Sequence, residues 1–130
     1  MADPARDKRQ SLGRRAEGLA AAHLERQGYR ILARNWRRPE GEIDLVAGKD
    51  DLCVFVEVRS RTGTDRGHPL ETVDARKRAR VRRAARVFLD QETLPAGLTF
   101  RFDVVGVTFG AEESSPELVH IEDAFRAGDD

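Results

Sequence analysis

Cysteine is almost absent from the sequence: Cys53 is its single example, which excludes a disulfide framework. Long apolar runs are absent too, since none approaches the roughly 20 residues that a bilayer-spanning helix needs. Residues 1–10 lack the apolar stretch of a secretion signal. Aromatic residues make up 6% of the chain and apolar residues 39%, which predicts a small hydrophobic core. Together these absences predict a cytoplasmic protein that does not enter a membrane.

Charge, in contrast, is abundant and unevenly distributed. The 130 residues include 23 Lys or Arg and 23 Asp or Glu, so the net charge is zero. Residues 1–103 nevertheless hold 22 of the cations and 16 of the acids, whereas residues 104–130 hold one arginine and seven acids. Residues 76–86 alone carry seven cations and no acid. Separate cationic and anionic surfaces can hold phosphate at one place and a metal ion at another.

The spacing of apolar residues predicts an α/β domain. Helices are expected over 11–27 and 72–91, and strands over 29–37, 42–47, 52–61, 98–107 and 117–121, before a last helical turn at 124–125. Three sequential strands can form a meander, and the long second helix then places the fourth strand parallel to the third. The expected fold is a mixed sheet with helices on both faces. The length predicts a single domain over 11–127, after a flexible tail at 1–10.

Two carboxylates stand in the middle of consecutive predicted strands. Asp44 should face away from Ile43 and Leu45, which alternation places together on the other side of their strand. Glu57 lies on the next strand among apolar residues, where an acid is costly to bury unless a cation or a hydrogen bond balances it. Two acids that point the same way form an oxygen site suited to Mg²⁺ or Mn²⁺. Glu17, on the first predicted helix, is a candidate third carboxylate, with an ordinary ion pair as the alternative role.

Four segments carry specific motifs: GEIDLV at 41–46, VFVEVRSR at 54–61, RFDVV at 101–105 and IEDAF at 121–125. They resemble the YraN-like family of bacterial proteins, and the resemblance covers nearly the whole chain. That family is in turn similar to the restriction-endonuclease-like PD-(D/E)XK superfamily and, within it, to archaeal Holliday-junction resolvases. The resemblance implies an αβββαβ core and a Glu…Asp…Glu-X-Lys site, whose acids would be Glu17, Asp44 and Glu57.

Arg59 occupies the position where the superfamily usually has lysine. A guanidinium does not release its proton in proteins, so Arg59 is expected to hold negative charge and not to act as a base. On the second predicted helix, Lys77 falls on the apolar row between Val73 and Val81. Lys77 is therefore a candidate for a lysine displaced from the strand to the helix. The alternative is that its side chain extends past the apolar row into solvent.

The opposite side of the same predicted helix is rich in arginine. A helical projection places five residues there: Arg76, Arg80, Arg82, Arg83 and Arg86. Five exposed arginines on one side can straddle the phosphates of DNA. The alternative is an arginine-rich surface that serves only solubility.

These features together favour a nucleic-acid-binding protein of the PD-(D/E)XK nuclease fold. The expected activity is that of a divalent-metal-dependent endonuclease on branched or structured DNA, with Asp44 and Glu57 as ligands of Mg²⁺ or Mn²⁺. The resemblance to resolvases allows a homodimer. Two alternatives remain open: a non-catalytic DNA- or RNA-binding module, and a protein-interaction adaptor that docks through the acidic residues 112–130.

Overall fold

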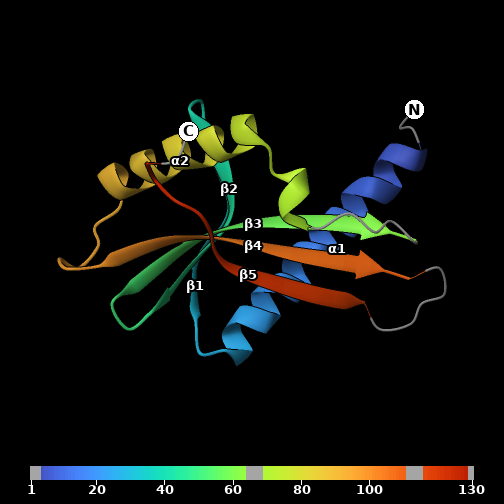
Figure 1. Ribbon diagram of the computed structural model, residues 1–130, viewed down its shortest axis with the longest axis horizontal. Helices are drawn as coiled ribbons and strands as arrows, with labels where there is room; N and C mark the ends of the chain where they lie inside the picture. The colour runs from blue at the N-terminus through green and yellow to red at the C-terminus, as the bar shows by residue number, and fades with distance from the viewer. Residues whose placement is uncertain (1–3, 64–68, 111–115, 129–130) are drawn as a thin grey trace.

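Helices and strands follow one another in the predicted order. The computed structural model describes residues 4–63, 69–110 and 116–128. The elements are α1 (Pro4–Arg26), β1 (Arg30–Arg38), β2 (Gly41–Lys49), β3 (Leu52–Thr62), the short 3-10 helix η1 (Pro69–Thr72), α2 (Ala75–Gln91), β4 (Thr99–Phe109) and β5 (Glu117–Phe125) (Figure 1). Neither α-helix, within the described residues, has the length and apolar character that crossing a membrane requires.

The five strands form one sheet in the order β1-β2-β3-β4-β5. Neighbouring strands are antiparallel, except that β3 and β4 are parallel over their whole length. A parallel pair needs a crossover connection, and η1 and α2 supply it. The expected meander, crossover helix and mixed α/β sheet are therefore confirmed.

Side chains of β3 alternate between two hydrophobic clusters. Cys53 and Phe55 pack in the cluster that includes residues of α2, whereas Val54 and Val56 pack in the cluster that includes residues of α1. Since successive side chains of a strand point to opposite faces, the two helices pack against opposite sides of β3. The buried residues of α1 are mostly alanines, which let this helix approach the sheet closely.

Three boundaries differ from the sequence-based expectation by more than two residues. The first helix begins at Pro4 and not at residue 11, and α2 begins at Ala75, after η1. The last helical turn expected at 124–125 is wrong, because β5 continues through Phe125. Its pairing with β4 shifts register between Phe102 and Val104, and Asp123 has a positive φ of 53°. A bulge in a strand, and not a turn of helix, produces the irregular pattern at this end.

Candidate functional site

The site begins where β2 separates from β3. The last partners in the β2–β3 ladder are Leu45 and Val56. At the next position Asp44 Oδ2 accepts a hydrogen bond from the backbone N–H of Val58 at 2.8 Å, so a side chain takes the place of a backbone carbonyl. β2 stays paired with β1 as far as Gly41. The β1–β2 hairpin thus leaves β3 at Asp44, and the fork between them contains the Asp44 carboxylate.

The fork changes which side chains face α2. Ile43 packs in the cluster with α2, whereas Leu45 packs in the cluster with α1. The expectation that these two residues share a face is wrong, because the strand bends at Asp44. Gly41 permits the close approach of the hairpin to α2: a Cβ at this position would meet the backbone carbonyl oxygen of Arg80. The tip of the hairpin therefore rests directly on the helix backbone.

Two carboxyl groups meet in the fork, those of Asp44 and Glu57, and they share a hydrogen bond. Burial, and then the charge of Glu57, raise the pKa of Asp44 to about 8, although the Val58 N–H opposes the shift. Burial also raises the pKa of Glu57, against the hydrogen bond with Asp44 and the charges of Arg59 and Lys77. At neutral pH and without a cation, the pair therefore holds a proton.

Arg59 lies beside this pair, on the face of β3 that alternation predicts. Its Nη1 is 3.5 Å from Glu57 Oε1, and its Nε donates to Thr72 Oγ1 at 2.9 Å. The Thr72 hydroxyl in turn donates to the carbonyl of Pro69 at 2.7 Å. The turn η1 thus fixes the guanidinium next to the acid pair, where it supplies positive charge.

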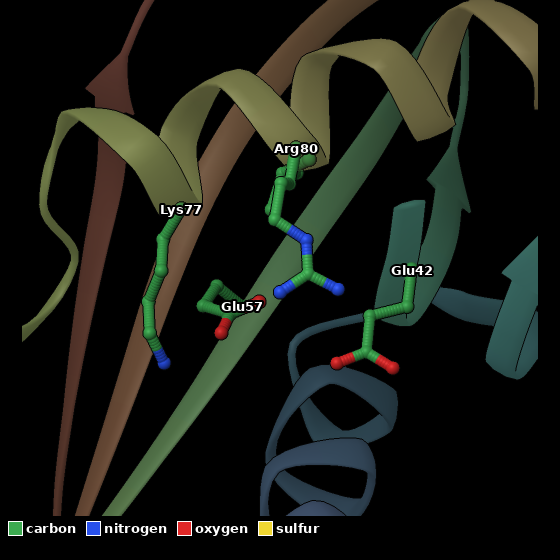
Figure 2. Close-up of a pocket in the computed structure, with 5 residues that line it drawn as sticks. Glu42, Glu57, Lys77 and Arg80 are labelled. Atoms are coloured by element: carbon green, nitrogen blue, oxygen red, sulfur yellow. The ribbon is translucent and has the colours of Figure 1, made fainter. Parts of the chain in front are cut away.

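Lys77 reaches the acid pair from α2. The helix begins there because Asp74 caps it, with Oδ1 accepting from the Lys77 N–H at 2.9 Å. The Lys77 side chain lines a hollow together with Glu57, Glu42 and Arg80, and Figure 2 shows both cations extending from the helix toward the carboxylates. The positive charge of Lys77 lowers the pKa of Glu57. Lys77 is half-buried and lines this hollow with Glu57, which agrees with the apolar row, while part of the residue stays accessible to solvent. We call the hollow that Glu42, Glu57, Lys77 and Arg80 line the α2 hollow.

A second hollow lies on the α1 side of the fork. It is lined by five residues of α1 and β1: Gly13, Arg14, Glu17, Asn35 and Arg37. Asn35 stands opposite Asp44 in the β1–β2 register, so this space, which we call the α1 hollow, lies next to the fork. The charge of Glu17 also raises the pKa of Asp44. Sequence reasoning missed Arg14, Asn35 and Arg37. One signal was present, because asparagine within a strand is a residue that tolerates positive φ, and Asn35 has a φ of 48°.

The donor set at the fork fits a divalent cation, but through two carboxylates and not three. Among the described residues, no group of three or more His, Cys, Asp or Glu side chains is placed to hold one metal ion. Asp44 and Glu57 are crowded carboxylates in a largely buried place, where a cation would relieve their repulsion. Mg²⁺ is commonly held by one or two carboxylates and several waters, so two oxygen donors suffice.

The arginines of α2 do not all face solvent. Arg76, Arg83 and Arg86 are exposed, as the helical projection predicts, and Arg80 is exposed while it lines the α2 hollow. The expected exposure of Arg82 is wrong, since only 6% of this residue is accessible. Residues at and after the end of β5 cover it: Arg82 Nε donates to the carbonyl of Arg126 at 2.9 Å, and its guanidinium carbon lies 5.5 Å from the Phe125 ring centroid. The C-terminal end beside α2 is visible in Figure 1.

A polar network away from the fork centres on Asp103. This fully buried carboxylate accepts two hydrogen bonds from Arg101 at 2.8 Å and lies 2.7 Å from His120 Nε2. His120 Nδ1 lies 3.1 Å from His23 Nε2 in α1. Burial opposes ionisation of Asp103, but hydrogen bonds with His120, Arg101 and the Asp123 N–H outweigh it and lower its pKa. These contacts give Asp103, His23 and His120 structural roles.

Comparison with known proteins places the chain among close relatives. The profile described as "Uncharacterised protein family UPF0102" matches residues 16–107. A UPF0102 protein of Pseudomonas aeruginosa is 48% identical over 122 residues, which are 94% of this chain and 98% of that protein. A UPF0102 protein of Moorella thermoacetica is 46% identical over 117 residues, 90% of this chain and 97% of that protein. One of Roseiflexus castenholzii is 43% identical over 114 residues, covering 88% and 92%.

Proposed function

The chain belongs to the UPF0102 family, and from its own site we propose that it is a divalent-metal-dependent endonuclease acting on branched or structured DNA. The proposal rests on one observation above all: a lysine lines the same hollow as Glu57, one member of the acid pair. Lys77 and Glu57 come from different elements and meet beside Asp44. Two acids and a lysine are the groups that the resembled nuclease superfamily uses, and here the lysine comes from a helix.

Each of these side chains has a role that its position supports. Asp44 and Glu57 would hold Mg²⁺ or Mn²⁺, which when bound polarises a phosphodiester and activates a water. Lys77 is placed to exchange a proton with the attacking water or to hold charge on the phosphate. Arg59, fixed by Thr72, supplies a positive charge that stabilises the additional charge of the transition state.

The exposed arginines of α2 extend the same surface away from the acid pair. Arg76, Arg83 and Arg86 stand on the helix that carries Lys77, so a DNA strand seated at the α2 hollow would pass them. In this proposal the protein acts in the cytoplasm and is a homodimer, as resolvases are. A binding module without turnover is the second candidate, because Arg59 stands where the superfamily has its lysine.

The metal site is tested by thermal melting with and without Mn²⁺. Binding to the folded state alone stabilises the parent by about 2.7 kcal/mol at a hundredfold excess over Kd, so the melting temperature should rise. The double variant Asp44→Asn with Glu57→Gln should lose this rise. Its matched control, Asp90→Asn with Glu92→Gln, removes two exposed acids at the end of α2 and should keep it. An equal response in the double variant and the parent would rule out the site.

The nuclease activity is tested on plasmid, single-stranded and four-way-junction DNA with Mn²⁺. We expect cleavage by the parent and a loss of about a hundredfold or more in the variant Lys77→Gln, the usual scale for a proton-transfer group. The metal-induced rise in melting temperature should persist in Lys77→Gln, which separates turnover from metal binding. A parent that binds these DNAs and cleaves none of them would favour the binding module.

A further inference from the structure

The α1 hollow carries positive charge that the proposed chemistry does not use. It opens on the α1 side of the fork, where Asn35 stands opposite Asp44 in the β1–β2 register. A Cβ at Gly13 would have no neighbour within 4 Å, so this edge of the hollow is open space. The two hollows thus adjoin one pair of carboxylates from two directions.

Three polar groups in the α1 hollow are available to a ligand. No carboxylate among the described residues pairs with Arg14, and the Asn35 amide makes no side-chain hydrogen bond with a described residue. Arg37 Nε lies 3.3 Å from Glu42 Oε2, but 72% and 48% of these side chains are exposed. Ion pairs in such exposed positions are weak, so Arg37 can exchange this partner for another anion.

The backbone at Asn35 places its side chain among these cations. In the β1–β2 register Asn35 stands opposite Asp44. The pairs on either side, Arg34 with Leu45 and Trp36 with Ile43, are formed, but Asn35 and Asp44 are not paired. Its φ of 48° is uncommon for a residue other than glycine, and such conformations gather at functional positions. The break in β1 pairing at Asn35 and the separation of β2 from β3 at Asp44 therefore occur at facing positions of the β1–β2 pair.

We propose that the α1 hollow binds a second phosphate of the same nucleic-acid strand, next to the phosphate at the acid pair. This inference rests on the proposed function. Guanidinium groups offer paired N–H donors that match phosphate oxygens, and the Asn35 amide adds two donors. Glu17 is the single acid among the residues that line the hollow, against two arginines, so the hollow keeps a net positive charge. The strand would then cross the fork, with one phosphate on each side of Asp44.

The test uses single-stranded oligothymidylates of increasing length in buffer without divalent cations. Each phosphate contact that is lost lowers the slope of log affinity against log salt by about 0.7 on single strands. The double variant Arg14→Gln with Arg37→Gln removes the contacts to this one phosphate and should therefore reduce the slope by about 0.7 on an oligonucleotide long enough to fill both hollows. Thymidine monophosphate, whose single phosphate can occupy the α1 hollow without a metal ion, should bind the variant more weakly than the parent.

The control is Arg30→Gln with Arg34→Gln, which removes the same charge from exposed positions of β1 that do not line the α1 hollow. Its salt slope should stay at the parent value, and all variants should melt at the parent temperature. An unchanged slope in the Arg14 and Arg37 variant, or an equal reduction in the control, would overturn the second phosphate site alone. If the parent protein binds no oligonucleotide at low salt, the proposed function is contradicted as well.

Discussion

Asp44 combines two tasks at the scale of a single residue. Its carboxylate completes the β2–β3 ladder by accepting from Val58 N–H, and it also forms the acid pair with Glu57. The first task needs an acceptor oxygen and the second needs a titratable group. The variant Asp44→Asn keeps an acceptor oxygen but has no titratable carboxyl group, so the two tasks can be separated by experiment.

This separation gives a prediction for pH dependence. The pKa of Asp44 is raised from 3.8 to about 8 in the folded protein, mainly by burial, so the folded state binds the proton more tightly than the unfolded chain. Without metal, its contribution to the free energy of unfolding is complete below about pH 4 and is lost as pH rises to about 8. Asp44→Asn should therefore show a shallower fall of stability in denaturant titrations over this range. The exposed control Asp90→Asn should follow the parent, and a slope in Asp44→Asn equal to that of the parent would contradict the assignment.

The sequence predicts the acid pair well and its surroundings less well. Strand alternation is sufficient to place Glu57 and Arg59 on one face, and helical spacing is sufficient to direct Lys77 inward. Alternation fails at Ile43, because a strand that bends no longer has a period of two. It also gives no sign of the burial of Arg82, since the covering segment is more than 40 positions away in the chain.

At the scale of the element, the position of α2 over the fork depends on Gly41. The hairpin tip contacts the carbonyl of Arg80, and any side chain at Gly41 would displace the helix. We expect Gly41→Ala to destabilise the protein by about 1–3 kcal/mol, as overpacking generally does. Gly18→Ala is the control: this exposed glycine of α1 has no neighbour within 4 Å, and alanine favours a helix by about 0.5–1 kcal/mol. The melting temperature should fall in Gly41→Ala and rise in Gly18→Ala. An unchanged melting temperature in Gly41→Ala would show that the helix can shift without cost.

The elements themselves could be predicted from periodicity because each has a clear apolar pattern. The exception is the end of β5, where the bulge at Asp123 interrupts alternation and gives Ala124 and Phe125 the spacing of a helical turn. The bulge is stabilised by a distant residue, because the Asp123 N–H donates to Asp103 Oδ1 at 3.0 Å. A local sequence pattern cannot predict a contact between residues that are 20 positions apart in the chain.

At the scale of the whole molecule, the Asp103 network joins α1, β4 and β5. The contact between His23 and His120 needs one ring nitrogen to donate and the other to accept, so at least one ring must stay neutral. Burial, and then the charges of His120 and Arg26, lower the pKa of His23 below 6.5. The unfolded chain therefore binds this proton more readily, and stability falls as pH decreases below about 6.5. His23→Asn should weaken this fall in melting temperature, and melting curves that stay parallel from pH 7 to 5 would contradict the prediction.

The order of strands in the sheet follows the order of strands in the chain, and this has a consequence for folding kinetics. The pairs β1–β2, β2–β3 and β4–β5 connect neighbours in sequence, so each can form as a local hairpin. The β3–β4 pair is different, because the chain must close a loop through η1 and α2 before these strands meet. Glu57 lies on β3 and Lys77 on the segment that closes the loop. The acid pair therefore acquires its lysine in the same non-local step that joins the two halves of the sheet.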